Sequence, residues 1–159
     1  ANAKDVIVDA ADDELTAIPA GYAVIKDGKM AGILGLDTAR GVSILQNKLK
    51  SCYTELSVDG QNTAVLMDKC DCEIDSEKRE ISIKLSATLA ETKGEVQIER
   101  LNLALENAAE KWVKAALDAT EIYGCDFIGI EKPDYASYNI NVSAEVGRSF
   151  DIENTEGEE

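Results

Sequence analysis

Apolar and polar residues alternate with a period of two over much of this chain, which is the pattern of strands with one buried face. Four runs show it, at residues 52–58, 64–74, 81–89 and 139–146. The polar loop Asp75 to Lys78 is short enough to join the second and third runs as an antiparallel hairpin. We therefore expect strands at all four places, each with one face buried and the other exposed to solvent.

From about Glu95 to Tyr123 the apolar period changes to that of a helix. The positions that recur at steps of three and four are Ile98, Leu101, Leu105, Ala108, Trp112, Ala115, Ala119 and Ile122. At 1.5 Å per residue this helix is about 40 Å long, enough to cross a sheet. A coiled coil is the alternative, but alanine fills several stripe positions, which favours close packing on a sheet with Trp112 as a core anchor.

The opening unit of the chain is expected to be a hairpin followed by a short helix. Asp27-Gly28 separates the apolar runs Tyr22 to Ile25 and Met30 to Leu34, and this dipeptide is typical of two-residue turns with positive φ. Gly35 closes the second strand, and Asp37 is placed to cap a helix over residues 36–48. The apolar positions of that helix are Leu36, Ala39, Val42, Leu45 and Leu49.

Three further segments complete the prediction. Gly124 suits the left-handed end of the long helix, and Phe127 to Ile130 forms a short apolar run expected to be a strand. Residues 6–8 are a short strand or the end of a linker, and the sequence leaves both open. The fold class is α+β: an antiparallel or mixed sheet of four to six strands, one long helix on its face and one short helix.

We divide the chain into three parts. Residues 1–17 are a linker or a segment added for expression, residues 18–150 are a single domain, and residues 151–159 are an acidic tail.

The order of these parts resembles a known family. The segments that carry the resemblance are Lys26-Asp27-x-Lys29-Met30-x-Gly32-x-Leu34, then Asp37-Thr38-x-Arg40-Gly41, a charged strand pair, one long helix and Gly124-Cys125-Asp126-Phe127-Ile128-Gly129. Over residues 18 to 148 the chain looks like the C-terminal domain of the Ger(x)C family, the C subunits of GerA-type nutrient germinant receptors of bacterial spores. Family members usually carry a longer segment where only Lys132 to Tyr138 stands here.

Charge narrows the classes of partner. The formal net charge is −15, and the acidic residues gather at both ends. Nucleic acid requires a basic footprint, so we expect no nucleic-acid partner, and binding to an anionic lipid surface through this domain is disfavoured. No apolar run approaches the length of a membrane span, so we expect the fragment itself to be soluble.

Candidate chemistry is sparse. The chain has no histidine, which removes the commonest general base and the usual activator of serine or cysteine. Gly28, Gly32 and Gly35 are spaced as hairpin glycines and not as a phosphate loop. Acidic pairs such as Asp71-x-Glu73 arise by chance among 31 acids. We therefore assign no catalytic, cofactor-binding or metal-binding residue and no cofactor.

Three kinds of side chain remain to be placed. Four cysteines, at 52, 70, 72 and 125, do not have zinc spacing, and buried free thiols are expected; a bridge from Cys52 to Cys70 or Cys72 stays open. Three roles are open for Arg40: it is exposed on the helix, it forms a salt bridge that anchors the hairpin to the helix, or it contacts a partner. Asp126 is expected to cap a turn after the long helix.

The resemblance implies a function. It implies a non-catalytic receptor subunit that docks beside two membrane-embedded partners, the A and B subunits, on the outer face of the spore inner membrane. A lipid anchor upstream of this fragment would make the only membrane contact. The alternative is an extracytoplasmic small-ligand-binding domain or metal-dependent enzyme. The edge strand, the hairpin Tyr22 to Leu34 and the short helix are the candidate docking surfaces, and the sequence does not rank them.

Overall fold

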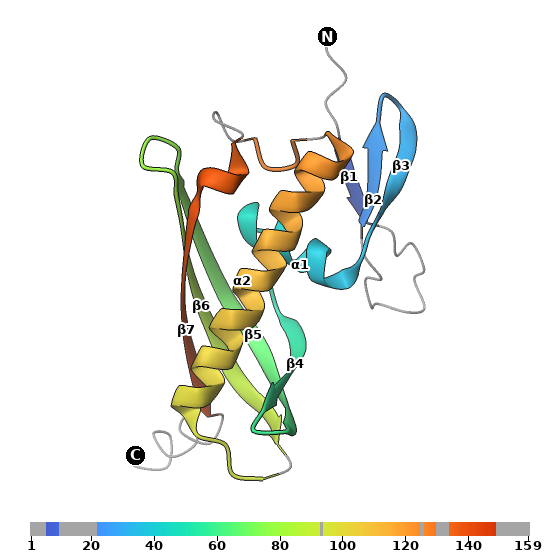
Figure 1. Cartoon of the computed structure of the whole chain (residues 1–159). Helices are drawn as coiled ribbons and strands as arrows, with labels where there is room; N and C mark the ends of the chain where they lie inside the picture. Colours follow the sequence, from blue (N-terminus) through green and yellow to red (C-terminus); the bar gives the residue numbers. More distant parts are fainter. Residues whose placement is uncertain (1–5, 10–21, 93, 125, 130–133, 149–159) are drawn as a thin grey trace, which may run out of the picture.

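A computed structural model describes residues 6–9, 22–92, 94–124, 126–129 and 134–148, with the backbone alone at residues 6–9 and 135. It confirms the predicted α+β class. In chain order the elements are β1 Val6–Asp9, β2 Tyr22–Lys26, β3 Lys29–Leu34, α1 Leu36–Leu45, β4 Cys52–Val58, β5 Gln61–Asp75, β6 Glu80–Thr92, α2 Ile98–Tyr123, a 3-10 turn Tyr135–Ser137 and β7 Asn139–Arg148 (Figure 1).

The larger sheet has the strand order β4-β5-β6-β7. Strands β4, β5 and β6 pair antiparallel through short turns, whereas β7 pairs parallel with β6, with Ile83 opposite Val142. A parallel pair needs a long crossover, and α2 supplies it. The sheet is therefore of the mixed kind that the sequence left open.

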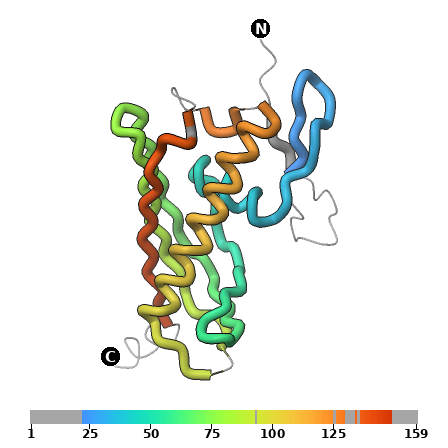
Figure 2. The backbone as a smooth tube through the Cα atoms, viewed as in Figure 1, coloured from blue at the N-terminus to red at the C-terminus, as the bar shows by residue number. Residues whose placement is uncertain are grey.

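Helix α2 runs diagonally over one face of this sheet (Figure 2). The core between them contains Ile81, Ile83 and Leu85 from β6 and Leu101, Leu105 and Val113 from α2, all at most 2% exposed. The predicted stripe was wrong at its last position, since Ile122 is 77% exposed. A stripe of alternating threes and fours has a period near 3.5 and drifts off the buried face of a helix with 3.6 residues per turn.

A second, three-stranded sheet has the order β1-β2-β3. Strand β1 pairs antiparallel with β2, with Val6 opposite Ile25, so residues 6–9 form the strand that the sequence left undecided. The predicted turn between β2 and β3 is confirmed, because Asp27 and Gly28 have φ angles of 51° and 76°. A bulge then leaves Ala31 unpaired, since Val24 pairs with Gly32 and Ile25 with Met30.

Helix α1 is shorter than predicted and has a different cap. Its N-cap residue is Gly35, which has no side chain to accept a bond, and Asp37 lies inside the first turn. The helix ends at Leu45 because Asn47 takes a left-handed φ of 55°. The amide of Lys48 bonds the carbonyl of Ser43 at 2.8 Å, as in a Schellman motif with asparagine at the position that glycine usually fills.

The segment after α2 also differs from the prediction. Gly124 ends the helix with a φ of 59° and a ψ of 32°, as expected. Phe127 and Ile128, however, form a bend and not the predicted strand, whose last residue, Ile130, is outside the described residues. The Oδ1 atom of Asp126 accepts bonds from the amides of Ile128 at 3.1 Å and Gly129 at 2.8 Å, which confirms the turn-capping role predicted for it. Backbone amides satisfied within a turn are not available to a sheet.

Candidate docking surface

Helix α1 lies very close to α2 at one point, where a glycine faces a backbone. A Cβ atom on Gly41 would stand 1.9 Å from the carbonyl oxygen of Trp112, so no other residue fits without moving the helices apart. Most of α1 beyond its first turn is buried as a result. Of the candidate surfaces, the short helix thus offers little beyond Leu36, which is 42% exposed.

Arg40 belongs to this junction. Its guanidinium lies 5.1 Å from the ring centroid of Trp112, its Nη2 donates to the Tyr53 carbonyl at 3.1 Å, and its Nη1 lies 3.7 Å from Asp37. The side chain is 15% exposed. The exposed arginine and the bridge from hairpin to helix were both wrong: Arg40 joins α1 to β4 and α2. Its burial also makes Arg40 a poor choice for a charge-reversal test of surface contacts.

The hairpin β2–β3 is fixed to both helices by its inner face. Lys26 Nζ donates to the carbonyls of Tyr123 at 3.1 Å and Gly124 at 3.3 Å, where the C-terminal end of α2 carries partial negative charge. The hydroxyls of Tyr22 and Ser43 are 2.7 Å apart. A Cβ atom on Gly32 would meet the ring of Tyr123 at 2.7 Å, which shows how tightly β3 packs there.

The opposite face of this hairpin is apolar and open. Four side chains lie on it, because their neighbours Val24, Gly32 and Leu34 face the helices. They are Ala23, Ile25, Met30 and Ile33, and we call them the hairpin face. Met30 is 65% exposed and Ile33 is 60% exposed. The bulge at Ala31 explains why two residues three apart share one face of a strand.

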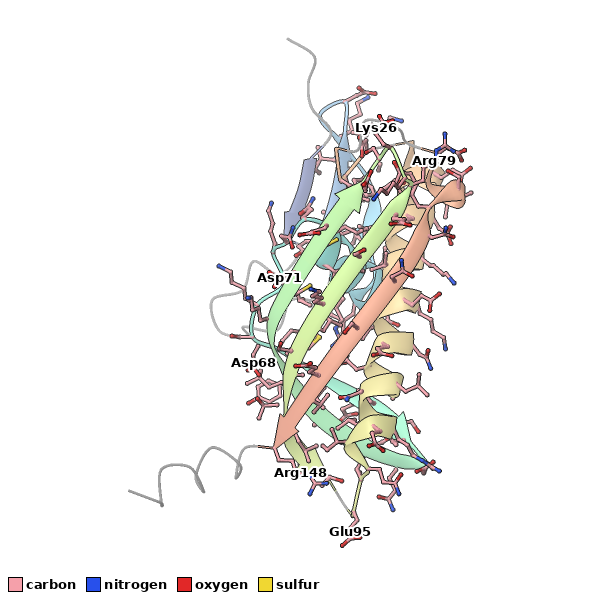
Figure 3. The ribbon with its side chains drawn as sticks, turned by 90° about the vertical axis from the view of Figure 1, so that its left-hand side faces the viewer. Lys26, Asp68, Asp71, Arg79, Glu95 and Arg148 are labelled. Atoms are coloured by element: carbon pink, nitrogen blue, oxygen red, sulfur yellow. The ribbon has the colours of Figure 1, made fainter. Side chains whose placement is uncertain are left out.

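The outer face of the larger sheet provides the contrast. It carries polar side chains, among them Ser82, Lys84, Ser86 and Thr88 on β6, and Figure 3 shows it with Asp71 on β5 and Arg148 at the end of β7. Polar side chains are normal on the solvent-exposed face of a sheet whose other face is buried. The hairpin face departs from that rule, and large exposed apolar groups gathered in one place indicate an interaction surface.

The sheet edges also differ. Strand β7 is shielded by α2, since Glu106 Oε1 accepts from the Ala144 amide at 3.1 Å and Asn102 Oδ1 accepts from the Val146 amide at 2.8 Å. Strand β4 has the contact from Arg40. On β3, no described residue outside the sheet makes a hydrogen bond to the backbone of Lys29–Leu34. Exposed, apolar and unshielded edges accept further strands.

The three described cysteines form neither a disulfide nor a reactive thiol site. Cys52, Cys70 and Cys72 are free thiols, and Cys52 lies opposite Met67, which rules out the bridges left open by the sequence; Cys125 is outside the described residues. Burial and the Asp71 carboxylate raise the pKa of Cys70 to about 11, and burial, Cys70 and Glu73 raise the pKa of Cys72 to about 12. Thiols that stay protonated are poor nucleophiles.

A depression of about 420 Å³ lies beside these thiols and is lined by Asn47, Cys70, Asp71, Cys72, Glu73, Ser82 and Lys84. The Asn47 side chain makes two hydrogen bonds with the backbone of Cys72: its Oδ1 accepts from the amide at 2.7 Å, and its Nδ2 donates to the carbonyl at 2.9 Å. Asn47 thereby occupies one bonding position on the edge of β5 beyond the end of β4. Within the described ranges, no three His, Cys, Asp or Glu side chains are grouped so as to hold a metal ion.

Comparison with known proteins fits this architecture. A family model described as "Spore germination B3/ GerAC like, C-terminal" matches residues 20–149. The chain belongs to this family. The match confirms the resemblance to the Ger(x)C family that the sequence suggested over residues 18 to 148. No curated protein sequence matches significantly.

A solved structure has the same fold. The crystal structure titled "Crystal Structure of the GerBC protein" superposes with a TM-score of 0.70 at 18% identity, covering 93% of this chain and 57% of that one. The chain thus spans little more than half the length of that relative. None of the helices in the described ranges is long and apolar enough to cross a bilayer.

Proposed function

We propose that this domain is part of a non-catalytic C subunit of a spore nutrient germinant receptor, and that it works by docking to the membrane-embedded A and B subunits. Membership of the spore germination family over residues 20–149 is the observation that carries the proposal. The open, apolar hairpin face supports docking, because such a face is more stable when another protein covers it.

Docking is favoured over direct sensing by the nature of the surface. Small-molecule sites are concave and combine an apolar lining with a few convergent polar groups. The depression beside Cys70 is lined mainly by polar and charged side chains, and the thiols there have raised pKa values. The hairpin face has the opposite character, which suits a protein partner.

The location follows from the same proposal. The parent protein is a lipoprotein on the outer face of the spore inner membrane, with its lipid-bearing cysteine upstream of this fragment. The complete gene tests this: a signal sequence ending in a lipobox cysteine is expected. A gene that starts near Asp5 without one contradicts the location.

Gene deletion in the spore-forming source organism tests the function. Spores that lack the gene should fail to germinate with the cognate nutrient, and the restored wild-type gene should recover both germination and the level of A and B subunits in the inner membrane. Normal germination without the gene, in a strain free of paralogues, contradicts the proposal. Tight binding of an amino acid or sugar to the isolated domain, measured by calorimetry, would replace docking with direct sensing.

A further inference from the structure

We infer that β3 is the docking edge, and that it accepts an extended segment of a membrane-embedded receptor subunit that is apolar at alternate positions and acidic beside Lys29. The inference rests on the function proposed above and adds to it the edge, the mode of pairing and the chemistry of the partner segment.

The backbone of β3 is the first argument. In a hairpin closed by a two-residue turn, alternate residues of each strand point their amide and carbonyl groups away from the other strand. Strand β3 is at the end of the order β1-β2-β3, so one side of it pairs with no strand of the described residues. The side-chain contacts that occupy β4 and β7 have no counterpart on β3 among the described residues. An added strand would complete the sheet there.

The hairpin face is the second argument. A strand laid beside β3 would place every second side chain next to Met30 and Ile33, the two most exposed members of that face. Apolar cross-strand pairs stabilise such neighbours, whereas a polar segment would leave them uncovered. Alternate apolar positions are therefore what this edge selects.

Charge selects between partners. Residues 22–50 contain five basic and two acidic residues, a net charge of +3 in a chain of net charge −15. Lys29 is exposed and makes no ion pair with any described residue. A second copy would bring another lysine-bearing hairpin of like charge to this edge, and a lipid headgroup has no backbone amides and carbonyls to pair with it. An acidic protein segment is the complementary partner.

Site-specific photocrosslinking in intact spores tests the edge. The full-length parent protein carries p-benzoylphenylalanine in place of Ile33 or, as the control, in place of Ser86, which is exposed on the polar face of β6. We expect the Ile33 position to crosslink to the A or B subunit and the Ser86 position not to do so. A crosslink to a second copy, to lipid alone or to nothing overturns the inference.

Charge reversal tests the partner's chemistry. With the photocrosslinker at Met30, Lys29→Glu should lower the yield of the crosslink to the receptor subunit at least 10-fold, whereas Lys84→Glu, an exposed lysine on the outer face of β6, should leave it unchanged. Equal yields overturn the acidic-partner inference. Immunoblots for the parent protein confirm that both variants accumulate.

The two proposals can fail separately. If deletion abolishes germination but Lys29→Glu and Ile33→Asp both restore it fully with normal crosslinks, the receptor function stands and the β3 edge is wrong. If deletion leaves germination normal, the receptor function itself falls.

Discussion

The guanidinium of Arg40 lies over the indole of Trp112, 5.1 Å from the ring centroid, and the same side chain donates to the Tyr53 carbonyl at 3.1 Å. One residue thereby connects α1, α2 and β4. Its planar group can stack and donate at the same time, which a lysine ammonium cannot do in the same geometry. This accounts for the arginine in the Asp37-Thr38-Ala39-Arg40-Gly41 segment on structural grounds.

Replacing Arg40 by lysine should therefore destabilise the domain. We expect Arg40→Lys to lower the free energy of unfolding by about 1–2 kcal/mol, from a weakened stacking contact and a lost hydrogen bond. Urea unfolding followed by tryptophan fluorescence measures it. Arg100→Lys is the matched control, because Arg100 is an exposed residue that pairs with Asp59, and no measurable change is expected. Equal midpoints for both variants would contradict the role assigned to Arg40.

Gly41→Ala should be more damaging. The added methyl group meets the Trp112 carbonyl oxygen at 1.9 Å, and the backbone cannot give way as a side chain can. We expect a loss of about 3 kcal/mol or failure to accumulate folded protein. Gly147→Ala is the control, since nothing lies within 4 Å of its Cβ position, and it should unfold at the wild-type urea concentration.

The shielding of β7 can be tested on one helix. Asn102→Ala removes the side chain that accepts from the Val146 amide, so we expect a loss of about 1–2 kcal/mol. Asn107→Ala is an exposed substitution on the same helix and should change stability by less than about 0.5 kcal/mol. Hydrogen exchange at Val146 should accelerate in the first variant alone; unchanged exchange would contradict the shielding.

The thiols should resist alkylation in the native protein. Because burial raises the pKa of Cys70 from 9.0 to about 11, its thiolate fraction at pH 8 falls on the order of 100-fold, and Cys72 should react more slowly still. Mass spectrometry after iodoacetamide treatment measures this against urea-unfolded protein. Native and unfolded rates within a factor of a few would contradict the burial of these groups.

The same shifts predict a loss of stability in alkali. Between pH 9 and about 12 the native protein keeps thiol protons that the unfolded chain has released, so the free energy of unfolding falls as the pH rises through this window. Below pH 9 these thiols are protonated in both the native and the unfolded state, so their contribution to the free energy of unfolding does not change with pH. The variant Cys70→Ser with Cys72→Ala should show a flatter decline, and an identical slope would assign the alkaline loss to other groups.

Sequence periodicity was sufficient to predict most of the elements. Strands over 52–58 and 139–146 lie where alternation predicted them, and the Asp27-Gly28 turn and the Gly124 helix end have the expected φ angles. These features depend on neighbours in the chain and on the few residues that adopt a positive φ at low cost. The α+β class follows from them.

Some local features escaped prediction although their signals were present. Asn47 stops α1 in a left-handed conformation, and asparagine is the second choice after glycine at that position. The bend at Phe127 and Ile128 follows Asp126, whose turn chemistry competed with an apolar run too short to decide between strand and turn. In both places a polar side chain satisfied backbone amides or fixed a backbone angle that hydrophobic periodicity does not register.

The tertiary structure alone decided what surrounds the candidate docking surface. Periodicity assigns residues to faces but does not say which faces meet, and so Arg40 could not be placed over Trp112 before α1 and α2 were seen to touch at Gly41. The exposed position of Met30 and Ile33 depends likewise on a bulge and on which side of the hairpin meets α2. Contacts between residues distant in sequence arise from packing, and packing is a property of the whole fold.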